Sequence, residues 1–171
     1  MASTPEQILN AFATRVASNV TPAEFNADTV AIVDAERPEM TDRRLHAQVV
    51  PQAMTLPDSR NLLAIAEISI DLVIFLRSHL DRPSAMSSVI SSNAGATLVS
   101  LLNTMGDAMR GSYLSSTLLT PLELRTVSSP TAAPVESGMG MVRGSLTFAA
   151  RAELDWSSDV LANDGLTPEV S

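Results

Sequence analysis

The sequence predicts an α+β fold, in which a mostly antiparallel sheet of four to five strands is packed by two main helices. Two segments, 5–18 and 94–110, repeat apolar residues at helical spacing, and several others alternate apolar and polar residues as strands do. A chain of 171 residues is long enough for one core. We expect a single domain over residues 1–156 and a flexible acidic C-terminal segment over residues 157–171, where few side chains can be buried.

Both helices carry recognisable end signals. Thr4 can cap the first helix, Pro5 suits its first turn, and Gln7 can reach back to complete a capping box. Gly111 is a suitable C-cap for the second helix. The apolar residues of the first helix fall on one face: Ile8, Phe12 and Val16. Those of the second also follow helical spacing: Leu98, Leu101, Leu102, Met105 and Met109.

The remaining regular segments are typical of strands. Pro51 is expected to stop one of them, because proline lacks the backbone donor that a strand ladder needs. Residues 128–140 are rich in Pro, Gly, Ser and Thr and are expected to form a long mobile loop between the last two strands, which can pair as a hairpin. The expected strands cover residues 30–33, 45–50, 65–77, 122–127 and 142–154.

The alternation is clearest in segment 65–77. One set of alternate positions is apolar throughout: Ile68, Ile70, Leu72 and Ile74. The other set begins with polar residues and ends with large apolar ones: Glu67, Ser69, Asp71, Val73 and Phe75. We expect the first face to lie in the core. The second face should be exposed to solvent at its polar end and buried under other parts of the chain at its apolar end.

Composition argues against several kinds of partner. The net charge of −8 opposes direct binding to nucleic acid or to an anionic membrane surface, and an aromatic content of 4% leaves few rings for stacking bases. The chain has no Cys, so it can form neither a disulfide nor a thiolate metal site. Its start lacks the features of a secretory signal, and its most apolar stretch is too short to cross a bilayer. We expect a soluble protein of the cytoplasm, with no membrane partner.

The residues that could carry chemistry do not form a recognisable site. His46 and His79 have neither a nucleophile motif nor metal-ligand spacing around them, and a satisfied structural histidine is the more common case. Glu67 and Asp71 would lie about 13 Å apart in a strand, too far for paired carboxylate catalysis. The glycine-containing segment 138–140 lacks the rest of a phosphate-binding loop. We therefore expect no enzyme, no cofactor and no metal.

Four segments, in this order, resemble small tail-assembly proteins of long-tailed bacteriophages, in particular the tail terminator or tail completion family. They are Ala35-Glu36-Arg37-Pro38, Leu45-His46-Ala47-Gln48-Val49-Val50-Pro51, Ser59-Arg60 and Glu67-Ile68-Ser69-Ile70-Asp71-Leu72. The resemblance spans residues 5–156 in the order of elements. It implies a virion protein, assembled in the host cytoplasm, that closes as a ring, usually a hexamer, on the tail tube. Its implied partners are the tail tube protein and the head connector or neck protein.

Under this interpretation, four charged residues are expected at or near subunit contacts: Arg37, Arg60, Glu67 and Asp71. Charges on a strand face and in its flanking loops need partners when a neighbouring subunit covers them. Three alternatives stay open: another head-tail connector or neck protein, a non-viral protein-binding module, and an enzyme. In the enzyme, acids such as Asp34 or Asp71 would meet His46 or an arginine in a pocket that the spacing does not reveal. The alternative to an interface role for the arginines is that they form solvent-exposed ion pairs with acidic residues nearby in the sequence.

Overall fold

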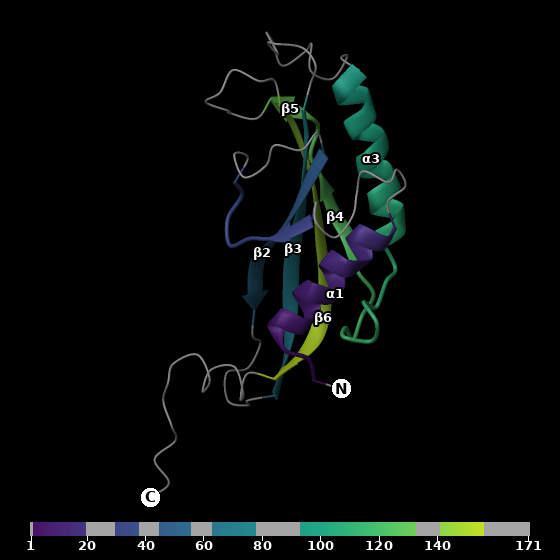
Figure 1. Cartoon of the computed structure of the whole chain (residues 1–171). Helices are drawn as coiled ribbons and strands as arrows, with labels where there is room; N and C mark the ends of the chain where they lie inside the picture. Colours follow the sequence, from purple (N-terminus) through teal and green to yellow (C-terminus); the bar gives the residue numbers. More distant parts are fainter. Residues whose placement is uncertain are drawn as a thin grey trace, which may run out of the picture.

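The computed structural model describes residues 2–19, 30–37, 45–55, 63–77, 93–132 and 141–155, and each structural statement below refers to these residues. They form two helices and a mixed, mostly antiparallel sheet, so the predicted α+β class is confirmed (Figure 1). The elements in chain order are α1 (Pro5–Ser18), β1 (Val30–Ile32), β2 (Leu45–Thr55), β3 (Leu63–Arg77), α3 (Asn93–Met109), β4 (Glu123–Val127), β5 (Thr131–Ala132) and β6 (Met141–Asp155).

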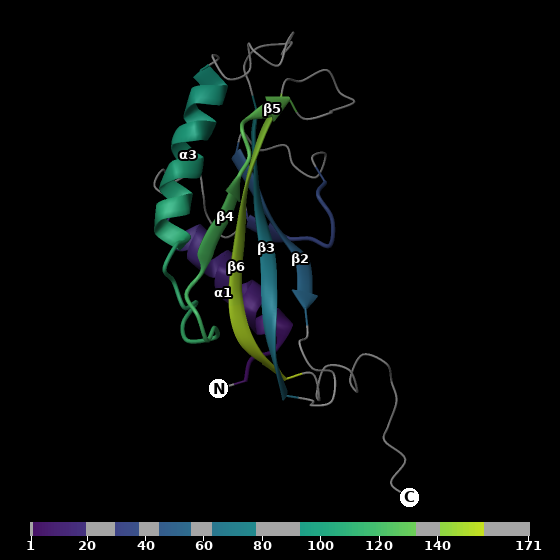
Figure 2. The same ribbon diagram turned by 180° about the vertical axis from the view of Figure 1, so that it is seen from behind.

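The sheet is built around the long antiparallel pair β3 and β6. Its strand order is β1-β2-β3-β6-β4, and the two-residue β5 also pairs with β6 (Figures 1 and 2). Among the strands that the structure describes, only β1 and β2 run parallel. The sheet therefore has six strands where four to five were expected, because a short segment of the predicted loop adds to the edge of β6.

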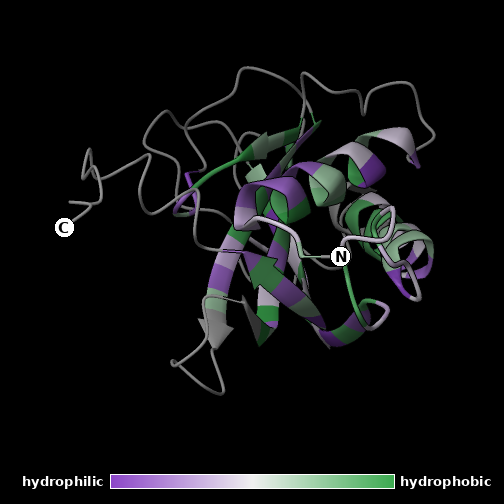
Figure 3. Ribbon diagram, turned by 90° about the horizontal axis from the view of Figure 1, so that it is seen from below, coloured by the Kyte–Doolittle hydropathy of each residue, from purple (hydrophilic) through white to green (hydrophobic). Residues whose placement is uncertain are grey.

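Both helices cover the same face of the sheet (Figure 3). Phe12 of α1 meets Phe148 of β6 edge to face, with the ring centroids 5.7 Å apart. Arg15 joins the helices, because its guanidinium Nη2 donates to the carbonyl of Ala108 over 2.9 Å. The main core therefore lies between one helical layer and one face of the sheet. Neither described helix is long and apolar enough to cross a membrane.

The predicted ends of the helices are close to the observed ones. The Thr4 hydroxyl accepts from the Gln7 N–H over 3.2 Å, and the Gln7 side chain accepts from the Thr4 N–H over 3.0 Å, which confirms the capping box. Gly111 follows α3 with a φ of 81°, a conformation that glycine adopts without strain. Its N–H donates to the Leu122 carbonyl over 2.9 Å and ties the end of α3 to the start of β4.

The two faces of β3 are divided as the alternation predicts. Its apolar face lies in the main core, whereas Glu67 at the other face is exposed and Val73 and Phe75 are buried in a second, smaller cluster. The predicted faces of β6 are also confirmed. Its core-facing residues are Leu146, Phe148, Ala150 and Ala152.

The expectation that Pro51 ends a strand is wrong. β2 does not stop at Pro51 but continues to Thr55, with a register shift between Pro51 and Ala53. Proline is tolerated there because β1 pairs only with residues 47–49, so the outer edge of β2 at this point needs no donor toward β1. The predicted hairpin of β4 and β6 is confirmed, also with a register shift.

The start of the predicted loop 128–140 is paired with β6. Ser128 donates its N–H to the Ser145 carbonyl over 2.9 Å, and β5 follows three residues later. The expectation of a loop is therefore wrong for residues 131–132, which form β5, whereas the expected mobility stays a prediction. Residues 133–140 and the predicted C-terminal segment 157–171 lie outside the described residues, so both expectations stay predictions there.

Candidate interface on the open face of the sheet

The sheet face that carries no helix is divided into a covered half and an open half. After β1 the chain turns onto this face as a short strap, defined here as residues 33–37. Val33 of the strap packs on a small apolar cluster from three strands, which consists of Val50, Val73, Phe75 and Met141. The strap covers the end of the face where β3 carries its large apolar residues, and so buries them.

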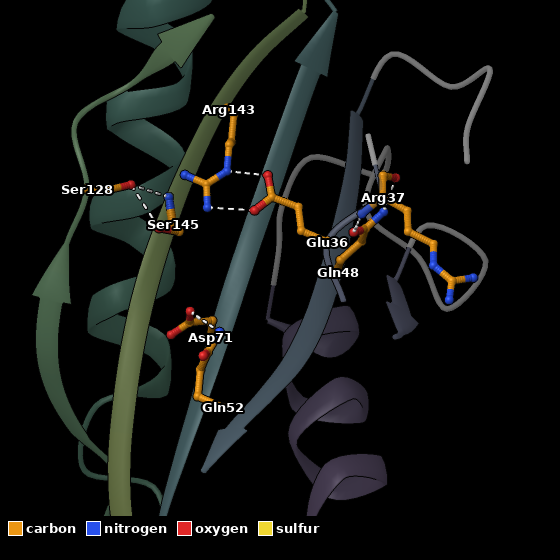
Figure 4. A network of polar contacts seen from close by, with 8 residues as sticks. All are labelled: Glu36, Arg37, Gln48, Gln52, Asp71, Ser128, Arg143 and Ser145. Carbon is orange, nitrogen blue, oxygen red and sulfur yellow. Dashed lines mark hydrogen bonds and ion pairs between the residues drawn. The ribbon is translucent and has the colours of Figure 1, made fainter. Parts of the chain in front are cut away.

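An ion pair fixes the strap to the far strand of the central pair. The guanidinium of Arg143 on β6 donates Nε to one carboxylate oxygen of Glu36 and Nη2 to the other, over 2.8 Å for the second contact (Figure 4). The two residues are 107 positions apart in the chain. Their side chains are 25% and 32% exposed, so solvent screens the pair only in part. Such a two-point contact fixes geometry as well as charge.

A buried amide holds the strap to β2. Gln48, whose side chain is fully buried, accepts from the Arg37 N–H over 2.9 Å and donates to the Arg37 carbonyl over 2.7 Å (Figure 4). These two side-chain hydrogen bonds hold the strap beside β2, where a further strand would be held by backbone hydrogen bonds. The Gln48 amide also lies 3.2 Å from Nε2 of His46, whose ring stacks on Phe75. His46 is thus a buried structural histidine in this network.

The side chain of Arg37 points away from the sheet. Its guanidinium Nη2 lies 2.7 Å from a carboxylate oxygen of Asp34, and the two side chains are 48% and 81% exposed. An exposed pair three residues apart contributes little to stability. The backbone of Arg37 therefore belongs to the fold, while its charged end lies at the surface, where a second molecule can reach it.

Asp71 joins the three central strands. One carboxylate oxygen accepts from the Thr147 hydroxyl over 2.7 Å, and the other accepts from the Gln52 amide over 2.8 Å. Gln52 lies at the irregular point of β2, so the register shift aims this amide at β3. The side-chain partners of Asp71 among the described residues are therefore a hydroxyl and an amide.

The open half of the face carries opposite charges side by side. Glu67 on β3 is the register partner of Arg151 on β6, and both are exposed. Among the described residues, no hydrogen bond or ion pair joins the side chain of Glu67 to another residue. Ile65, two residues before it on the same face, is 53% exposed. This half combines accessible charges of both signs with an accessible aliphatic group.

The four residues expected at subunit contacts do not lie together at one place in the structure. Glu67 lies on the open half, Asp71 forms its inner boundary, and the guanidinium of Arg37 lies outside the strap. Arg60, like His79 and residues 138–140, lies outside the described residues. Within the described residues, no group of three His, Asp or Glu side chains is placed to hold a metal ion.

Glu36, Gln48 and Arg143 were not predicted as functional residues from the sequence. The sequence does indicate on which face Arg143 lies. Arg143, Ser145 and Thr147 are at alternate positions of one strand, so their side chains lie on the same face of the sheet. No such indication exists for Glu36, since the path of the strap across the sheet is set by contacts with residues far away in the chain.

Comparisons with known proteins found similar chains among solved structures. No family model matches the chain, and no curated protein matches it. One of the similar chains belongs to a structure titled "Virion of native gene transfer agent (GTA) particle", with a TM-score of 0.44 and 18% sequence identity. The alignment covers 85% of this chain and 93% of that chain.

Proposed function

We propose that this protein is a structural subunit of a phage-like virion, a tail terminator that closes as a ring on the tail tube and joins it to the head connector or neck. The observation that carries the proposal is the open half of the sheet face, where Glu67 and Arg151 are accessible beside Ile65. Charged groups opposite each other on a rigid sheet suit a contact with a protein surface that carries both signs. The resemblance of four segments to tail terminators agrees with it.

The placement of three of those segments adds support. Glu36 and Arg37 come from the first, Gln48 from the second and Asp71 from the fourth, and all lie on the helix-free face of the sheet. The contacts hold a strap against the sheet and leave the charged end of Arg37 outside. In the proposed ring, a neighbouring subunit or the tube meets Arg37, Arg60, Glu67 and Asp71.

The proposed role is assembly and involves no catalytic reaction, no cofactor and no metal. Its proposed partners are further copies of this chain, the tail tube protein and the connector protein. Self-association is tested first, because that experiment needs no other protein. With a net charge of −8, neither nucleic acid nor membrane is part of the proposal.

The proposal is tested by the mass of the purified chain in solution, measured by light scattering over a range of concentrations and followed by negative-stain imaging. We expect rings of about six copies, the size that the tail terminator resemblance implies and a form that head-to-tail contacts can close. A monomer at every concentration, with no ring in any image, would favour the alternative of a protein-binding module that works as a single copy.

A further inference from the structure

Each outer edge of the sheet has a helix near its edge strand. α1 contacts β1 at one end of the strand order, and α3, which packs mainly on β6, comes close to β4 at the other end through Gly106 and Leu124. Four strand spacings, about 19 Å, separate the two edge strands. Among the described residues, no strand pairs with the outer side of either β1 or β4. Both edges therefore offer unpaired backbone groups to another chain.

The edge at β1 is hollowed. A cavity of about 280 Å³ lies between α1 and β1, and we call its lining the α1/β1 flank. Its lining combines small or apolar side chains with two polar ones, and Ile32 is 40% exposed. The lining residues are Asn10, Ala13, Thr14, Ala17, Val30 and Ile32.

The edge at β4 instead presents apolar side chains. Val127 of β4 is 52% exposed and Val99 of α3 is 37% exposed. Val99 lies two helical turns before Gly106, on the same side of α3, and Gly106 packs against Leu124 of β4. Both valines thus belong to the side of the molecule where α3 borders β4, which we call the α3/β4 flank.

Strand directions allow the two flanks to meet. β1 runs with β2, and the three antiparallel pairings from β2 to β4 leave β4 running opposite to β1. In a ring whose axis follows the strands, neighbouring copies keep the same strand directions. The β4 of one copy would therefore meet the β1 of the next in antiparallel orientation, which is the more stable pairing. The sheet and the helical layer would both continue from one copy to the next.

The area available indicates a ring rather than an isolated pair. A stable interface buries about 800 Å² on each partner. Two half-exposed valines and a strand edge of three residues can supply only part of it, so one such contact is weak. A head-to-tail dimer leaves one flank of each kind unused, whereas a closed ring uses every flank.

We infer that the α3/β4 flank of one copy docks into the α1/β1 flank of the next, with Val127 and Val99 entering the cavity beside Ala13 and Ala17. This inference rests on the proposed function and names the surfaces that would close its ring. The occupant of the cavity is a second copy of this chain.

Substitutions on each flank test the docking. Val127→Arg and Ala17→Arg each place a charge where the other flank should fit, and we expect either one to abolish rings seen by light scattering and negative stain. Thr104→Arg is the matched control, since Thr104 is exposed on α3 and lies on the side turned away from Gly106. Circular dichroism and thermal unfolding of each variant establish that it folds. Rings of normal size from folded Val127→Arg and Ala17→Arg proteins would overturn the docking and leave the proposed ring intact.

Cross-linking gives a second readout, because the chain contains no Cys of its own. A chain that carries Ile32→Cys and Val127→Cys, treated with a short bifunctional maleimide, should give a ladder of covalent oligomers that ends at the size of the ring. Val127→Cys alone should give no covalent dimer. Rings without a ladder, or efficient dimers of the single variant, would overturn the head-to-tail arrangement. A wild-type chain that forms no oligomer up to its solubility limit, with no ladder, would refute both the docking and the proposed function.

Discussion

Replacing Gln48 by Leu should detach the strap while leaving the main core in place. Gln48 is fully buried, and its amide makes both hydrogen bonds that hold the backbone of Arg37. Each such bond contributes about 0.5–1.5 kcal/mol net, so Gln48→Leu should lower the free energy of unfolding by about 1–3 kcal/mol. For a chain of this size that corresponds to a fall in melting temperature of roughly 4–8 °C per 2 kcal/mol.

Urea unfolding and amide hydrogen exchange measure this effect. We expect a lower midpoint with little change in slope, and loss of exchange protection in residues 33–37 but not in β3 or β6. Gln52→Leu is the matched control, because Gln52 is exposed and its amide makes one hydrogen bond, to Asp71, so its cost should be clearly smaller. Equal costs for the two variants, or unchanged protection of the strap in Gln48→Leu, would refute the view that this amide holds the strap.

Three further predictions concern the core, the ion pair and the open face. Gly144→Ala should lower the free energy of unfolding by about 1–3 kcal/mol, because its Cβ would lie 2.7 Å from Cδ1 of the buried Leu102; an unchanged thermal midpoint would contradict this. Glu36→Arg should destabilise by about 1 kcal/mol in urea at low salt and less at high salt, and adding Arg143→Glu should recover part of it; no recovery would mean that the pair is not coupled. Glu67→Arg should change stability by less than about 0.5 kcal/mol yet abolish rings in light scattering, and normal rings would remove this residue from the proposed contact.

Local signals predicted much of this fold. The capping box at Thr4 and Gln7 locates the start of α1 because the partners lie three residues apart. The two faces of β3 follow from strict alternation. The change from a polar residue at Asp71 to an apolar one at Val73 indicates where the second face becomes buried. In each case the deciding interactions are either short in sequence or repeated along one element.

The errors occur where distant contacts decide. Pro51 looks like a strand end, but β1 is too short to reach it, so the sheet does not require its donor. Ser128 looks like the start of a loop, but its backbone and hydroxyl bond to Ser145. The pairing of Glu36 with Arg143 depends on the path of the strap across two strands, which no local pattern encodes.

The oligomeric mass of the unmodified chain tests the central claim most directly. Light scattering at increasing concentration, with negative-stain images of the same samples, should give a closed ring of about six copies, as the tail terminator resemblance implies. A single-copy mass up to the solubility limit, with no ring in any image, would contradict the claim that this chain is a ring-forming assembly subunit.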